Sequence, residues 1–388
     1  SLVLRLHIHK SKMKNFYMPP ELIEQILLRL PVVSLIRFKC VCKAWFSLIS
    51  DPQFAISHFN LISPPSSRLL LKLTEVSVCS VDMDFGVVHL TLPPPAVIQD
   101  ESSSASSNAP WILGSCRGLV CLNYQEKSND LIIWNPSTGV YNRFPLDASH
   151  DLCKSDKGSG SFGQLQLFLY GFGYDSAEDD YLLVIIHLTD DVEFFSFKTN
   201  TWNTVDGVEV EYMIDDLDFQ SGTLLNGAVH WLVSCERVHD DLEELVFVII
   251  AFDMTQRTFS EIQLFNDFSK NRHEIYGLRE LRGCLTLCCL DLSTDMIEIW
   301  MMRDEFLATW SRAMVISNLI RFCPISVTTD DRIFGSHVSL SLTLEKREHN
   351  GVLVMRCPFL YDYICPNLQS AMYTQSLLPP PSVIGGGR

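Results

Sequence analysis

A pattern of short segments recurs along this chain at intervals of roughly fifty residues, and it constrains the fold more than any other feature of the sequence. Each copy has an apolar run, a turn, and a polar strand that carries an aromatic residue. Three copies are IIWNPSTGVYNRF at 132–144, FFSFKTNTWNTV at 194–205 and IIAFDMTQRTFSEI at 249–262, and a fourth ends at Val315. A repeat of this length is close to one four-stranded propeller blade. The repeat therefore predicts an all-β, propeller-like domain.

The rest of the chain from residue 68 onward supports this prediction. Short apolar runs such as 118–122, 181–187 and 245–252 alternate with turns of Asn, Asp, Gly, Ser and Thr, and amphipathic helices are nearly absent. This pattern is typical of many short antiparallel strands. The tryptophans of the repeats are expected in the core between blades. They are Trp134, Trp202, Trp231, Trp300 and Trp310.

Residues 18–60 show a different, helical pattern, so the predicted fold class is mixed and mainly β. One apolar stripe at helical spacing consists of Leu22, Ile23, Ile26, Leu27 and Leu30. Pro31 ends this first helix because proline has no amide donor and clashes with the preceding turn. Ser34 is placed to cap a second helix, and Trp45 lies on a third. Asp51, followed by a proline, is placed to cap another short helical segment.

This helical unit has more large apolar side chains than it can hide. Roughly forty residues in short helices form a domain that is marginal alone. Some of the apolar surface is therefore expected to meet a partner. The alternative, in which the helices pack on the rest of the same chain, stays open because periodicity does not distinguish the two.

Residues 18–59 resemble an F-box over nearly their whole length. The matching segments are Pro20-Glu21-Leu22, Ile26-Leu27, Arg29-Leu30-Pro31, Ser34-Leu35, Arg37-Phe38, Val41-Cys42-Lys43, Trp45 and Asp51-Pro52-x-Phe54. Met18 stands where the family usually has leucine, and Val33 stands where a lysine is common. Neither difference removes an apolar anchor of the motif.

Residues from about 68 to 365 resemble the F-box-associated domain of the large plant F-box families, which include S-locus and kelch-repeat types. The matching segments are Gly118-Leu119-Val120-Cys121, Trp134-Asn135-Pro136-Ser137-Thr138-Gly139, Gly171-Phe172-Gly173-Tyr174-Asp175 and Gly227-Ala228-Val229-His230-Trp231-Leu232. A clean Gly-Gly pair in each blade, as in standard kelch repeats, is missing. The number of blades and the closure of the ring are therefore left open.

The resemblance implies a function in an SCF-type ubiquitin ligase. The F-box would bind a Skp-type adaptor and, through it, a cullin, while the β domain would bind a protein substrate and so direct its ubiquitination and proteasomal degradation. The implied adaptor contacts are Pro20, Leu22, Ile23, Ile26, Leu27, Leu30, Pro31, Leu35, Phe38, Val41 and Trp45. The chain itself would be a non-catalytic receptor. The insertions at 96–110 and 147–163 are candidates for substrate contact.

Two other functions are weighed against this one. The first is a scaffold that binds a partner without directing its degradation. The second is a propeller enzyme, which would need convergent polar residues that the sequence does not show. The expected boundaries are an extension at 1–17, the F-box at 18–60, a linker at 61–67, the β domain at 68–368 and a tail at 369–388, with Met13 or Met18 as a candidate natural start.

The net charge and the spacing of the cysteines limit which partners and which cell compartment are expected. The net charge of −16 argues against a general binder of nucleic acid or of an anionic membrane, because phosphate contacts need clustered Lys and Arg. The 13 cysteines are irregularly spaced and include no Cys-x-x-Cys pair, so the spacing predicts neither a disulfide framework nor a metal site. No cofactor is expected. A cytoplasmic or nuclear location fits these features.

Several motifs resemble catalytic or cofactor-binding signatures but lack the required context. Gly158-x-Gly160-x-x-Gly163 follows a polar stretch rather than a strand, so it is read as a loop. His273-Glu274 lacks the second histidine of a zinc-protease helix. His230 lies in an apolar run and is expected to be a hydrogen-bonded core histidine. The sequence therefore predicts no catalytic residue.

Overall fold

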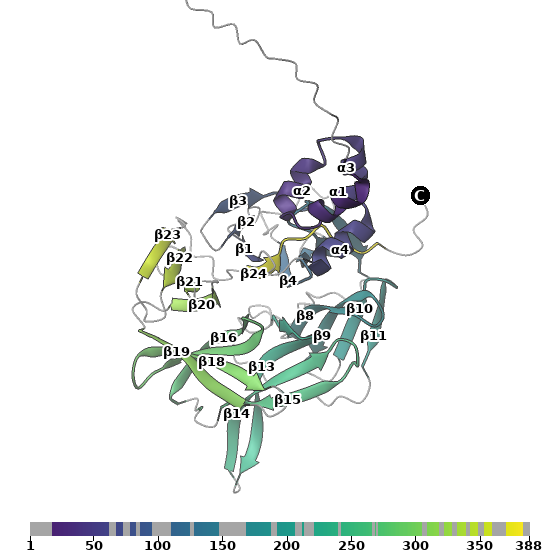
Figure 1. The fold of residues 1–388 in the computed structure, drawn as a ribbon. Coiled ribbons are helices and arrows are strands. Elements are labelled where there is room, and N and C mark those ends of the chain that lie inside the picture. The colour runs from purple at the N-terminus through teal and green to yellow at the C-terminus, as the bar shows by residue number, and fades with distance from the viewer. Residues whose placement is uncertain are drawn as a thin grey trace, which may run out of the picture. The chain divides into compact units, whose positions relative to one another are not determined.

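The computed structural model describes residues 18–61, 67–72, 78–82, 86–94, 110–124, 128–146, 168–187, 192–205, 212, 221–239, 242–265, 268, 271–304, 309–317, 322–327, 332–338, 342–347, 353–358 and 370–382. The chain divides into two compact units, Ser1–Pro65 and Ser66–Arg388. The first is helical and the second consists of strands (Figure 1).

The helices are α1 (Pro20–Leu27), α2 (Val32–Phe38), α3 (Lys43–Ile49) and α4 (Pro52–Leu61). The strands are β1 (Ser67–Lys72), β2 (Val78–Val81), β3 (Val87–Leu90), β4 (Trp111–Cys116), β5 (Leu119–Tyr124), β6 (Ser128–Trp134), β7 (Tyr141–Pro145), β8 (Phe168–Asp175), β9 (Asp180–His187), β10 (Val192–Ser196), β11 (Thr201–Thr204), β12 (Thr223–Leu225), β13 (Ala228–His239), β14 (Leu242–Asp253), β15 (Phe259–Gln263), β16 (His273–Leu281), β17 (Cys284–Asp291), β18 (Met296–Asp304), β19 (Thr309–Ser317), β20 (Phe322–Val327), β21 (Ile333–Val338), β22 (Leu342–Arg347), β23 (Leu353–Pro358) and β24 (Ser370–Thr374).

The starts of the helices follow local capping rules. Pro20 occupies the first turn of α1, where its missing amide costs nothing. The predicted cap at Asp51 is confirmed, because its Oδ1 accepts the backbone N–H of Gln53 at 2.7 Å. The N–H of Trp45 donates to Cys42 Sγ at 3.5 Å at the start of α3. These caps separate the four helices within a short stretch of chain.

The predicted cap at Ser34 is wrong. Helix α2 already begins at Val32, and the carbonyl of Pro31 accepts the N–H groups of Ser34 and Leu35. Pro31 stands at φ −57°, close to the helical value. The helix therefore starts directly after the proline that ends the previous one.

The second unit is the predicted propeller. Its described strands form six four-stranded antiparallel sheets. Five of them use four consecutive strands, from β4–β7 to β20–β23. The first strands of neighbouring sheets contact one another in the series β24, β4, β8, β12, β16 and β20, so these strands are the inner ones. Each sheet corresponds to one repeat of roughly fifty residues. Only four of these repeats were visible in the sequence.

The expectation of a tail at 369–388 is corrected by the structure. Strand β24 (Ser370–Thr374) pairs antiparallel with β1, with Leu69 opposite Met372, and becomes the inner strand of the sheet that β1, β2 and β3 complete. The two ends of the propeller sequence therefore share one sheet. A five-residue strand whose partner lies about three hundred residues earlier leaves no local pattern in the sequence.

Residues after β24 are also held by the propeller. Asn135 Nδ2 donates to the carbonyls of Ser376 at 3.1 Å and Leu378 at 2.9 Å. Gly118 stands at φ +81°, and a Cβ at this position would lie 2.4 Å from Ser376 Oγ. Only glycine fits there, because both the backbone conformation and the close approach exclude a side chain.

The core lies between adjacent sheets, and the large tryptophans take part in it as predicted. Trp134 and Trp231 are fully buried, while Trp202, Trp300 and Trp310 pack against the inter-sheet cores with part of their surface exposed. The N–H of the Trp231 ring donates to the Tyr170 carbonyl at 3.0 Å, across two neighbouring sheets. This hydrogen bond satisfies the polar atom that burial of the indole would otherwise strand.

Candidate functional site

The helical unit carries a group of exposed apolar side chains. Its large members range from 41% exposed at Val33 to 59% at Val41. The group, called the apolar helix surface below, comprises the exposed apolar residues before α4, namely Met18, Leu22, Ile26, Val33, Val41 and Phe46; Ile56 and Leu61 on α4 are exposed as well. A small domain that leaves this many large apolar side chains in water is suited to binding a partner.

Helix α1 shows how the surface arises. Its residues form two adjacent apolar stripes, each with i, i+4 spacing. Leu22 and Ile26 make the exposed stripe, at 55% and 49%. Ile23 and Leu27 make the inner one, of which Leu27 is buried. One stripe anchors the helix to its neighbours, and the other stays available.

Helix α3 is divided in the same way. Ile49 is buried, whereas Phe46 is 55% exposed. The ring of Trp45 is half-buried and packs against Phe38, with 5.4 Å between ring centroids. The Phe38–Trp45 pair thus fixes α3 against α2 and presents Phe46 outward.

The structure sorts the eleven predicted adaptor contacts into three groups. Five are exposed, namely Pro20, Leu22, Ile26, Pro31 and Val41. Four are half-buried, namely Ile23, Leu30, Phe38 and Trp45. Leu27 and Leu35 are 1% and 0% exposed. These two side chains are core residues here, because a partner could reach them only by repacking the helices.

Three exposed members of the apolar helix surface were not among the predicted contacts. They are Met18, Val33 and Phe46. Phe46 could have been found from the sequence, because α3 has apolar residues at five of its seven positions and a short helix cannot turn all of them inward. Met18 and Val33 are the two positions at which the chain departs from the F-box pattern.

A buried histidine connects two parts of the helical unit. The Nε2–H of His58 on α4 donates to the carbonyl of Leu30, at 2.9 Å. This carbonyl lies just after α1, so the hydrogen bond ties the last helix to the turn that follows the first. Burial lowers the pKa of His58, and the hydrogen bond to Leu30 opposes part of that effect. The neutral imidazole is therefore the form that the folded unit favours.

The connections that were predicted as substrate contacts follow β3 and β7, the last strands of two four-stranded sheets. The parallel bridge between Tyr170 on β8 and Ser221, just before β12, shows that these two neighbouring inner segments run in the same direction. In a propeller whose inner strands all run this way, strand alternation puts the ends of β3 and β7 at the same end as the long β13–β14 hairpin that projects in Figure 1. The insertions 96–110 and 147–163 themselves lie almost wholly outside the described residues, as does the Gly158–Gly163 motif.

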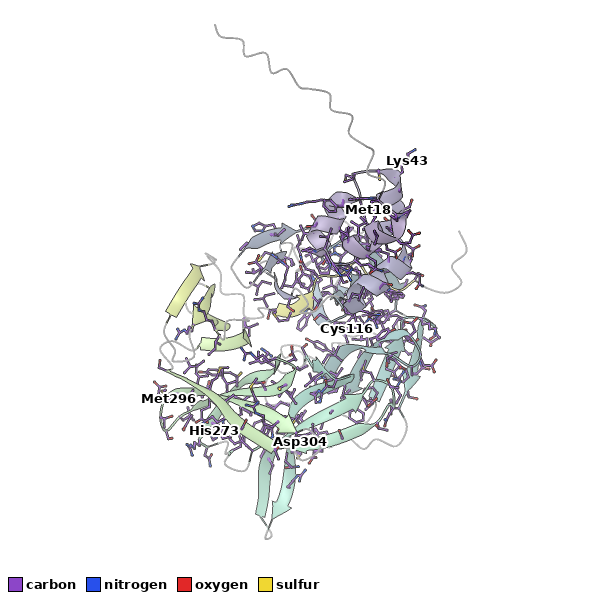
Figure 2. All side chains as sticks on the ribbon, viewed as in Figure 1. Met18, Lys43, Cys116, His273, Met296 and Asp304 are labelled. Atoms are coloured by element: carbon purple, nitrogen blue, oxygen red, sulfur yellow. The ribbon has the colours of Figure 1, made fainter. Side chains whose placement is uncertain are left out.

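Two further observations bear on other functions. His230 is buried and its Nδ1 lies 3.2 Å from the Thr223 carbonyl, which confirms the prediction of a hydrogen-bonded core histidine. Among the described residues, none of the helices has the length and apolar character needed to span a membrane. Figure 2 shows the side chains of the helical unit around Met18 and Lys43, and those of the propeller around Cys116, His273, Met296 and Asp304.

Comparison with known proteins agrees with both units. Residues 16–57 match the F-box domain, and residues 69–355 match the F-box associated beta propeller domain. The chain is similar to three proteins of Arabidopsis thaliana. F-box/kelch-repeat protein At3g23880 is 28% identical, over 79% of this chain and 81% of that protein. F-box protein CPR1 is 26% identical, over 77% and 72%. Putative F-box/kelch-repeat protein At1g62270 is 26% identical, over 85% and 84%. With matches to both domains, in the same order as the two structural units, the chain belongs to the family of plant-type F-box proteins that carry an F-box associated beta propeller domain.

Proposed function

We propose that this protein is the substrate-recognition subunit of an SCF-type ubiquitin ligase. The observation that carries the proposal is the apolar helix surface, which a unit of four short helices leaves in water. Its F-box character supports a Skp-type adaptor as the partner that covers it, and a cullin would be held through that adaptor.

The adaptor interface would be of the helix-in-groove kind. Such interfaces draw most of their binding energy from a few buried apolar and aromatic anchors. Leu22, Ile26 and Phe46 are the large apolar side chains that α1 and α3 offer at about half exposure. Pro20, Pro31 and Val41 would complete the contact, and the half-buried Ile23, Leu30, Phe38 and Trp45 would support it from below.

The propeller would bind the substrate protein. Its contribution to the reaction is proximity: holding a substrate lysine near a ubiquitin-charged enzyme raises the effective concentration of the two reactants. The chain would perform no bond chemistry in this mechanism. We further propose that the end of the propeller that carries the β3–β4, β7–β8 and β13–β14 connections faces the substrate, in the cytoplasm or the nucleus.

Adaptor binding can be measured with a pair of equally exposed leucines. Leu22 on α1 is 55% exposed and Leu292 on the propeller is 54% exposed. Leu22→Ala is expected to weaken binding to a purified plant Skp-type adaptor by about 2 kcal/mol, or roughly 30-fold, as loss of an interface anchor does. Leu292→Ala should leave the affinity unchanged in the same calorimetric titration. Equal affinities for both variants and the parent chain would reject the apolar helix surface as the adaptor site.

A second experiment separates a degradation receptor from a scaffold. Proteins captured from plant tissue by the full chain and by a chain without residues 19–59 are compared, with and without proteasome inhibition. A receptor predicts that its captured partner accumulates when the F-box is deleted or the proteasome is inhibited. A partner whose abundance responds to neither treatment would favour the non-degradative scaffold.

A further inference from the structure

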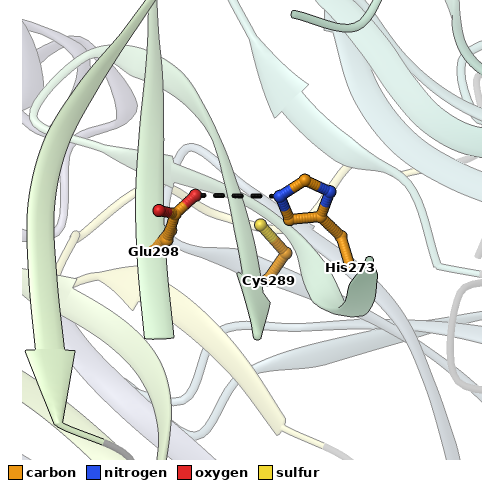
Figure 3. A group of neighbouring side chains, drawn as sticks. All are labelled: His273, Cys289 and Glu298. Carbon is orange, nitrogen blue, oxygen red and sulfur yellow. Dashed lines mark ion pairs between the residues drawn. The ribbon is translucent and has the colours of Figure 1, made fainter. Parts of the chain in front are cut away.

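Three residues that are far apart in the sequence meet within one sheet of the propeller. His273 is the first residue of β16, Cys289 lies in β17 and Glu298 lies in β18. Cys289 is directly opposite Glu298, and His273 is opposite Asp291, two residues along from Cys289. Side chains two residues apart on a strand share a face, so all three point to the same side of the sheet. Figure 3 shows the three side chains directed toward one another.

The three side chains form a compact set of metal-binding atoms. All three residues are buried, and the His273 ring nitrogen, the Cys289 sulfur and a Glu298 oxygen lie within 4.8 Å of one another. Imidazole nitrogen, thiolate sulfur and carboxylate oxygen are the donors that zinc takes in proteins. A tetrahedral zinc site sets such atoms roughly 3.3 to 3.8 Å apart, so each needs to move inward by only about 1 Å.

The Glu298 carboxylate is held by neighbours in the way that a metal-binding carboxylate usually is. Arg312 donates to Oε1 at 2.7 Å, and the ring N–H of Trp300 donates to Oε2 at 2.8 Å. His273 Nε2 faces Oε2 at 3.9 Å, which is longer than a hydrogen bond. A carboxylate oxygen can accept two interactions, so Oε2 has the capacity to bind an ion in addition to accepting the Trp300 N–H.

A cavity adjoins this cluster. It has a volume of about 270 Å³, and its lining consists of Arg272, His273, Glu298, Trp300, Trp310, Ser311 and Arg312. The cavity offers room for a water molecule, which is the usual fourth partner where a protein supplies three ligands.

The charged side chains around the cluster balance one another. Arg272 is paired with Asp291 at 2.8 Å, and Arg312 is paired with Glu298, so the two arginines are neutralised by two carboxylates. A divalent ion would convert the thiol to a thiolate and release its proton to solvent, so the cluster would gain one net positive charge.

We propose that His273 Nε2, Cys289 Sγ and the Glu298 carboxylate form a binding site for a zinc-type divalent metal ion in the β16–β19 sheet of the propeller. The ion would join β16, β17 and β18 from one face of the sheet and so stabilise the propeller. This proposal does not depend on the ligase function. Sequence spacing gave no sign of the site, because its ligands come from three strands and are aligned only by pairing.

The test uses the full chain and two neighbouring cysteines of β17. Cys289 and Cys288 are 0% and 1% exposed, but they face opposite sides of the sheet. The chelator-treated protein is titrated with Co²⁺, whose bond to a thiolate gives a charge-transfer absorption, and then with Zn²⁺. We expect one equivalent of Co²⁺ to bind with this absorption and Zn²⁺ to displace it. The Cys288→Ala variant should behave in the same way, whereas Cys289→Ala should lose the absorption.

Thermal unfolding in chelator and in excess Zn²⁺ provides the second readout. Zinc should raise the melting temperature of the parent chain and of Cys288→Ala, since an ion that binds only the folded state stabilises it. It should not raise that of Cys289→Ala or His273→Gln. Folding of each variant is checked by its cooperative transition in chelator. The proposal is overturned if the parent chain shows no thiolate absorption with Co²⁺, or if the absorption survives in Cys289→Ala.

Discussion

The two units of this protein treat their apolar residues in opposite ways. The propeller places its largest side chains, such as Trp134 and Trp231, between sheets at about 1% exposure. The helical unit leaves Leu22, Val41 and Phe46 more than half exposed. Chain length explains the difference, because six sheets enclose a large interior while four short helices cannot. The propeller is expected to be stable by itself, and the helices are expected to gain from a partner.

The largest effect should come from removing the strand that joins the ends of the propeller. A chain that stops at residue 369 lacks β24, which is the inner strand of its sheet, and leaves β1 with an unpaired edge. We expect loss of the cooperative thermal transition of the propeller, while binding of a Skp-type adaptor to the helical unit persists. Circular dichroism and calorimetric titration measure the two outcomes.

The matched control is a chain that stops at Ser382. It keeps β24, the hydrogen bonds from Asn135 to Ser376 and Leu378, and those from Asn142 to the carbonyls of Pro380 and Pro381. Its melting temperature should equal that of the full chain. A chain ending at residue 369 that melts in the same way as this control would show that β24 is dispensable, and the comparison between the units would lose its basis.

The next effect contrasts one large aromatic residue from each unit. Trp231→Ala empties a buried site between two sheets and removes one of the two hydrogen bonds that the Tyr170 carbonyl accepts, so it should cost about 3 to 5 kcal/mol of unfolding free energy. Phe46→Ala removes an exposed ring and should change the stability by less than about 0.5 kcal/mol. Urea unfolding of the full chain measures both.

For adaptor affinity the ranking should be reversed, with the larger effect in Phe46→Ala. Phe46→Ala is expected to weaken adaptor binding by about 2 kcal/mol, whereas Trp231→Ala should not affect it as long as the helices remain folded. A large stability loss in Phe46→Ala would mean that this ring belongs to the core, contrary to its 55% exposure.

Much of this division could be predicted from the sequence, because it rests on local patterns. The helical stripe from Leu22 to Leu30 and the Asn-rich and Asp-rich turns of the repeats are set by neighbouring residues. Asn135 is an example: its Oδ1 accepts the N–H groups of Ser137 and Thr138, which builds the turn predicted between two strands. Such features need no knowledge of distant parts of the chain.

The sequence could not show which of two adjacent stripes faces outward. Leu22 and Leu27 have the same chemistry and lie on the same predicted stripe, yet one is exposed and the other buried. The direction depends on how α1 packs against other helices, and periodicity carries no information on that. Strand β24 and the His273, Cys289 and Glu298 cluster were missed for a related reason, since both depend on pairing between distant strands.

The smallest predicted effect concerns the pH dependence of the helical unit. Burial lowers the pKa of His58 below its ordinary value of 6.5, so the unfolded chain binds a proton at a higher pH than the folded one. Stability is therefore complete above 6.5 and falls as the pH drops through that value toward the folded pKa. Hydrogen exchange of amides in Pro20–Leu61, corrected for intrinsic rates, should show weaker protection at about pH 5.5 than at about pH 7.5.

His58→Gln distinguishes this cause from a general effect of acid. Its side-chain amide retains a donor for the Leu30 carbonyl but does not titrate, so protection of α1 and α4 should become independent of pH in this range. The propeller provides an internal reference in the same experiment, because its amides do not depend on this histidine. If the variant lost protection at low pH as the parent chain does, His58 would not be the group responsible. The helical unit would then owe its acid sensitivity to charges on its surface rather than to the buried hydrogen bond that joins α4 to the end of α1.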